Sequence, residues 1–210
     1  MTEGISLRAA AAADAPAIHR LIADNLDAGH LLPRSIGDVE EHASRFVVAE
    51  ATDGGSAAVV GCAELAPLSD DVAEVRSLVV DHRFRGRQIG GQLVAHVAAA
   101  GVAQGFATLC AFTHEPRHFV RLGFSLVPHI WVPEKITHDC VGCSLFRRCG
   151  QYAVTLPLRA GATVRPERPA AVIQGRGIAA RRSNIERLQL RPVPFVEARQ
   201  EDAPAEAVPA

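Results

Sequence analysis

The run VRSLVVDHRFRGRQIGGQLV, residues 75–94, joins an apolar segment to a helix-like segment through a loop of arginines and glycines. Residues 72–81 are predicted to form a strand buried on both faces, because the run ends in consecutive apolar residues. After the loop, Ile89, Leu93 and Val97 recur on one face of a predicted helix. Free backbone N–H groups and the helix dipole favour an anion at such a helix start. The loop is therefore predicted to bind a phosphate, with a solvated basic turn as the alternative.

Strands and helices alternate over residues 1–158, which we expect to form one α/β domain. Helices are predicted to begin at Asp14, at Ser35 and at Pro116. Residues 131–150 form a cysteine-bearing insertion in this domain. Further strands are predicted at 5–10, 45–51, 56–68, 107–113, 124–127 and 151–158.

Residues 159–210 are rich in proline, arginine and alanine. This composition predicts a tail that packs poorly and is partly disordered, with one weak helix near 180–189.

Charge and composition exclude several classes of protein. The net charge is -1 and the isoelectric point is near 6.8, so neither nucleic acid nor a membrane surface is an expected partner. No segment approaches the roughly 18 apolar residues of a membrane span. The first residues show no signal peptide. Five cysteines, an odd number, favour the reducing cytoplasm over a disulfide framework.

Three motifs together resemble those of the GNAT family, the GCN5-related N-acetyltransferases. They are the 75–94 run, ATLCAF at 107–112 and HFVRLGF at 118–124. Family members carry L-x-V at the end of the fourth strand, a Q/R-x-x-G/A-x-G/A pyrophosphate loop, and an F/Y-x-x-L-G-F junction. The resemblance covers residues 5–158. It implies an α/β (α+β) fold with a mixed, mostly antiparallel sheet splayed between its fourth and fifth strands and helices on both faces.

The resemblance also implies that acetyl-CoA is the cosubstrate. Pantetheine would hydrogen-bond to backbone near Leu78 and Val80, and an oxyanion would meet a backbone N–H near Leu78 or Val79. Gln88 stands where the family has a small residue, so its side chain must point away from the phosphates or bind the cofactor. The diphosphate would be held by Arg85, Gly86, Arg87, Gln88, Ile89 and Gly90.

Acetyl transfer needs a base for the acceptor amine. Glu74 shares a strand face with Arg76 and Leu78, and by resemblance it occupies the general-base position. A structural Glu74–Arg76 pair is the alternative. Phe119 stands where family members carry the tyrosine that acts as general acid and protonates the CoA thiolate. His118 or His114 is therefore the candidate proton donor. Alternatively, the CoA thiolate leaves unprotonated.

The segment PEKITHDCVGCSLFRRC, residues 133–149, resembles the short, kinase-less N-acetylglutamate synthases of bacterial arginine biosynthesis. Ser144 departs from their proline. The resemblance implies transfer of an acetyl group to the α-amine of an amino acid, glutamate or a relative. The candidates for binding acceptor carboxylates are Arg76, Arg117 and Lys135.

The cysteines of this segment are expected to shape a loop over the acceptor site, with no metal. Zinc held by His138, Cys140, Cys143 and Cys149 is the minor alternative.

The expected partner is a small-molecule amine, and a homodimer is left open. Competing functions are a GNAT enzyme acting on another amine or a protein N-terminus, a non-catalytic acyl-CoA sensor, and a zinc-dependent interaction module at 138–149.

Overall fold

The computed structural model describes residues 4–26, 31–53 and 56–162. These residues lie in one compact unit, Met1–Pro166. The predicted helix near 180–189 and nearly all of the predicted tail lie outside the described residues. None of the described helices is long and apolar enough to span a membrane.

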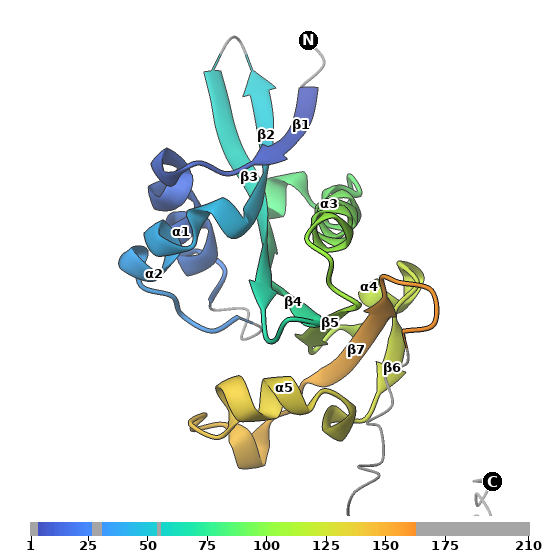
Figure 1. The fold of residues 1–210 in the computed structure, drawn as a ribbon. Coiled ribbons are helices and arrows are strands. Elements are labelled where there is room, and N and C mark those ends of the chain that lie inside the picture. Colours follow the sequence, from blue (N-terminus) through green and yellow to red (C-terminus); the bar gives the residue numbers. More distant parts are fainter. Residues whose placement is uncertain (1–3, 27–30, 54–55, 163–210) are drawn as a thin grey trace, which may run out of the picture. The chain divides into compact units, whose positions relative to one another are not determined.

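Seven strands form a single sheet in the order β1-β2-β3-β4-β5-β7-β6 (Figure 1). Neighbouring strands are antiparallel except β4 and β5, which are parallel. The mixed, mostly antiparallel sheet is thus confirmed. The strands are β1 (Gly4–Ala9), β2 (Phe46–Asp53), β3 (Ser56–Pro67), β4 (Val72–Val80), β5 (Thr108–Thr113), β6 (Ser125–Val127) and β7 (Tyr152–Pro157).

Helices cover both faces of the sheet, as expected (Figure 1). On one face, Ile18 and Ile22 of α1 (Ala15–Ala23) pack with Val48 of β2, and α2 (Ile36–Glu41) lies beside α1. On the other face, α3 (Ile89–Ala103) buries Leu93 and Val97 against the sheet. The short helix α4 (Pro116–Arg121) contacts β6 and β7, and α5 (Pro133–Lys135) begins the insertion.

The predicted helix starts differ in detail. Ser35 caps α2, since its hydroxyl accepts a hydrogen bond from the Asp38 N–H at 3.1 Å. Asp14 does not cap α1. Its carboxylate accepts hydrogen bonds from Arg8 and from the Ala11 N–H, so it fixes the turn that precedes the helix.

Strand β4 leaves β5 partway along its length. The two strands pair only over Val72–Glu74, although β4 continues to Val80 and β5 to Thr113. The predicted splay is therefore present, and it begins directly after Glu74.

A bulge lies in β4 just beyond this point. The pairing of β3 with β4 shifts between Cys62 and Glu64, so that two residues of β4 face one residue of β3. Ser77, in the bulge, has φ 51°, in the left-handed region that side chains other than glycine rarely adopt. The Cys62 thiol donates to the Ser77 carbonyl at 3.5 Å. The bulge thus bends the strand where the site opens.

The bulge predicts that stability depends on the residue type at position 77. Ser77→Val should lower the free energy of unfolding by about 1–3 kcal/mol, because a β-branched residue is strained at positive φ. Ser77→Gly should lose less, because glycine adopts this conformation freely. Urea denaturation of both variants measures the difference. A valine variant as stable as the wild type would contradict the strained bulge.

Candidate active site

The opening between β4 and β5 leads into a cavity of about 1110 Å³. One wall is β4 from Glu74 to Val80, and the loop into α3 and the first turn of that helix close one end. Residues from β5, α4 and α5 also line the cavity, as do Arg34, which precedes α2, and Gln151, which precedes β7. The cavity therefore connects the two regions that the sequence singled out, the anion loop and the candidate base.

The loop before α3 presents backbone N–H groups to the cavity. Gly86 has φ 80° and Gln88, the residue before α3, has φ 62°, so both are left-handed. The first bond of the helix runs from the Gln92 N–H to the Gln88 carbonyl at 3.1 Å. The N–H groups of residues 89–91 consequently have no intrahelical acceptor, and they lie at the positive end of the helix dipole, where an anion is favoured.

Of the loop residues predicted to hold the diphosphate, all but Arg87 line the cavity. Arg85, Gly86, Gln88, Ile89 and Gly90 line the cavity, as do Leu78, Val79 and Val80 of β4. Arg85 donates to the Val80 carbonyl at 3.2 Å and to the Asn25 side chain at 2.7 Å. Arg87 is not part of the lining; its guanidinium lies 5.0 Å from the centre of the Phe84 ring.

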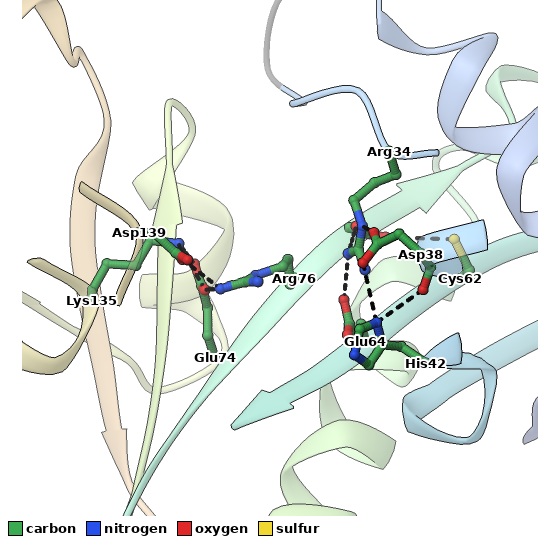
Figure 2. Close-up of polar contacts among 10 residues, drawn as sticks. Arg34, Asp38, His42, Cys62, Glu64, Glu74, Arg76, Lys135 and Asp139 are labelled. Atoms are coloured by element: carbon green, nitrogen blue, oxygen red, sulfur yellow. Dashed lines mark hydrogen bonds and ion pairs between the residues drawn. The ribbon is translucent and has the colours of Figure 1, made fainter. Parts of the chain in front are cut away.

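Glu74 lies at the centre of a cluster of four charges (Figure 2). Its carboxylate is buried and accepts hydrogen bonds from Arg76 at 2.7 Å and from Lys135 at 2.8 Å. Asp139 accepts from the same two cations, at 2.6 Å from Arg76 and 2.7 Å from Lys135. The candidate base and two of the three predicted acceptor cations therefore meet in space, joined by a residue of the insertion.

Asp139 is held as a carboxylate by its neighbours. Burial by itself raises the pKa of this group, but hydrogen bonds from Lys135 and His138 and the nearby charge of Arg76 outweigh burial and lower the pKa to about 2. Asp139 thus stays ionised at any pH near neutrality, and it fixes Lys135 beside Glu74.

Figure 2 also shows a second group of ion pairs, centred on Arg34, which the sequence did not reveal. Arg34 donates from Nη1 to Glu64 at 2.6 Å and to the Ser77 hydroxyl at 3.2 Å, and from Nε to Asp38. Glu64 is only 1% exposed. The one available signal was Glu64 itself, a charged residue in the apolar run 56–68, because a buried carboxylate requires a partner.

Residues of α4 occupy different positions relative to the cavity. His118 lines it, and its ring lies 3.6 Å from where a Cβ on Gly90 would stand. Burial, and then the charge of Arg121, lower the pKa of His118, so its imidazole is neutral at pH 7. Phe119 is buried against Phe124, with ring centres 5.1 Å apart. Arg117 is exposed and does not line the cavity, so the structure does not bring it to the other two cations.

The insertion carries three free thiols. Cys140 and Cys143 are half-buried, and Cys149 is exposed. Burial raises the pKa of the Cys140 thiol, which is therefore protonated at neutral pH. Within residues 4–26, 31–53 and 56–162, no three His, Cys, Asp or Glu side chains are arranged to hold a metal. His138 instead contacts Asp139 at 2.7 Å.

Comparison with known proteins identifies the family. Residues 15–124 match the model of the acetyltransferase (GNAT) family. An uncharacterized N-acetyltransferase of Chlorobaculum tepidum is 32% identical over 72% of this chain and 96% of that protein. An amino-acid acetyltransferase of Mycobacterium tuberculosis is 31% identical over 57% of this chain and 67% of that protein.

A similar solved structure is that of N-acetylglutamate synthase from Neisseria gonorrhoeae, complexed with coenzyme A and N-acetyl-glutamate. It superposes with a TM-score of 0.65 and 26% identity, over 76% of this chain and 36% of that one. The family match spans β4, the loop, α3, β5 and α4, whereas Lys135 and Gln151 of the cavity lining lie beyond it. The chain belongs to the GNAT family and is an N-acetyltransferase.

Proposed function

We propose that the protein transfers the acetyl group of acetyl-CoA to the α-amine of an amino acid, glutamate or a relative. The observation that carries this proposal is the buried Glu74 carboxylate, held by Arg76 and Lys135 in the cavity that ends at the first turn of α3. A base and cations for a carboxylate are what an amino-acid acceptor requires. Relatives named amino-acid acetyltransferase support the same class of acceptor.

The cavity fits a long cosubstrate with a diphosphate. The N–H groups at the start of α3 would receive the diphosphate. Beyond Glu74, the edge of β4 is not paired with β5, so the backbone from Leu78 to Val80 is available to the amide groups of pantetheine. Structural neighbours complexed with CoA support CoA as the cosubstrate.

In the proposed reaction, the neutral amine attacks the thioester carbonyl, the new C–N bond forms and the C–S bond breaks. Glu74 takes the proton of the amine, directly or through a water. A backbone N–H near the β4 bulge, at Leu78 or Val79, would stabilise the oxyanion. Phe119 has no proton to give, and His118 is neutral at pH 7 and hence a weak acid. The thiolate therefore leaves unprotonated and takes its proton from solvent.

Arg34 joins the proposed acceptor site, although the sequence did not suggest it. Its side chain lines the cavity, and Nη2 donates to no described residue. Arg76 and Lys135 each already bind two carboxylates. Arg34 thus has donors to spare for the acceptor's α-carboxylate, whereas the other two must share theirs.

Replacing the base should slow the chemical step. Glu74→Gln should lower kcat by on the order of 10²–10⁴-fold at neutral pH, because glutamine cannot accept the amine's proton. A higher pH should recover part of the loss, since more of the amine is then deprotonated. Steady-state release of CoA thiol, measured from about pH 6.5 to 9, gives the profile.

Glu50→Gln is the matched control. Glu50 is also paired with an arginine, Arg8 at 2.5 Å, but lies on β2 away from the cavity, so kcat should be unchanged. Acetyl-CoA affinity should be unchanged in both variants. If Glu74→Gln retains near wild-type kcat over the whole pH range, the base lies elsewhere, and His114 and His118 are the next candidates.

The anion loop can be tested by adding a charge. Gly86→Glu should abolish acetyl-CoA binding in calorimetry, because the new carboxylate would repel the diphosphate. Gly105→Glu is the matched control: Gly105 has φ 87° against 80° for Gly86, and a Cβ at either position meets nothing within 4 Å. Both variants therefore carry the same strain and charge, at opposite ends of α3. Equal affinities in the two variants would exclude the loop as the diphosphate site.

A further inference from the structure

A second cavity, of about 490 Å³, adjoins the first. Arg34 and Arg76 line both cavities and thus form the wall between them. The rest of the lining comes from α2 and the turn that follows it, from β3 and from the insertion, and it includes His42, Arg45 and His138. Nothing in the reaction described above uses this space.

The lining of this second cavity carries more positive than negative charge. It holds three arginines against two carboxylates, Asp38 and Glu64. Both carboxylates bind Arg34. Arg76 is paired with Glu74 and Asp139. The two imidazoles of the lining contact carboxylates through Nδ1, His42 that of Asp38 and His138 that of Asp139.

Arg45 is the arginine of this lining that has no carboxylate partner among the described residues. It ends a short 3-10 turn, Ala43–Arg45, its side chain is exposed, and it pairs with no carboxylate among the described residues. A guanidinium is a planar double donor suited to a carboxylate. The cavity therefore has an unused site for one anionic group.

We propose that this second cavity is a carboxylate subsite, in which Arg45 binds the second carboxylate of a dicarboxylic amino-acid acceptor. The inference rests on the proposed function and deepens it. With the amine at Glu74 and the α-carboxylate at Arg34, the acceptor's side chain extends past the Arg34–Arg76 wall, and its terminal group reaches Arg45. A neutral side chain would leave Arg45 without a partner, so the cavity selects an acidic amino acid.

The first measurement compares glutamate with glutamine as acceptors for the full chain. The wild type should have the lower KM for glutamate. Arg45→Gln should raise the KM for glutamate by about 10-fold, the loss of one charge-assisted contact, and leave kcat and the KM for glutamine unchanged. Arg45→Lys should restore part of the preference. Arg20→Gln, an exposed arginine on α1 outside both cavities, is the matched control and should leave all values unchanged.

The second measurement does not depend on turnover. Glutarate, a dicarboxylate without an amine, should bind the wild type in calorimetry, bind Arg45→Gln about 10-fold more weakly, and compete with glutamate. Equal glutarate affinity in the two proteins, or a glutamate preference that survives Arg45→Gln, overturns the subsite. Glutarate inhibition that is not competitive with glutamate also overturns it, since the anion site would then belong to a separate effector. If no amino acid is acetylated while glutarate binding still depends on Arg45, the proposed acceptor is wrong and the carboxylate site stands.

Discussion

The short ladder between β4 and β5 is the constraint on which the site depends. Three residues of each strand pair, Val72–Glu74 with Thr108–Cys110, and then the strands part. Buried backbone N–H and C=O groups must find hydrogen-bond partners. An unpaired strand edge inside the protein must therefore hydrogen-bond either to water or to a bound molecule. The separation creates the cavity and leaves β4 with an edge that can bind a ligand as a strand would.

The four-charge cluster joins the insertion to this edge. Lys135 lies 61 residues from Glu74 along the chain, and Asp139 lies 63 residues from Arg76. Removing one partner of a buried ion pair typically costs about 3–5 kcal/mol, because the other charge stays buried without compensation. The cluster therefore holds the insertion over the opening as well as placing cations beside the carboxylate. Apolar contacts add to this attachment, since Val132 at the start of the insertion is buried with Cys110 and Val127.

The sequence predicted the parts of the site that follow one another along the chain. The strand–loop–helix unit at 75–94 specifies its own geometry, because periodicity and glycine positions are local properties. Arg34 was missed because its role depends on Glu64 of β3 and Ser77 of β4, which are distant from it along the chain. Arg117 was expected at the acceptor site, but a six-residue helix such as α4 is too short for its apolar pattern to fix which side chains face inward. The direction of Arg87 depends on the left-handed residues on either side of it, which no pattern of residue types specifies.

The buried cysteine opposite Glu74 bears on whether an acyl group could be carried by the protein. Cys110 pairs with Glu74 across the β4–β5 ladder and is 0% exposed. Burial, reinforced by the charge of Glu74, raises the pKa of its thiol well above the usual value. Thioester exchange requires a thiolate that can reach the carbonyl, and Cys110 offers neither the charge nor the access. The acyl group therefore cannot rest on this sulfur between donor and acceptor, and this geometry excludes a ping-pong sequence through Cys110.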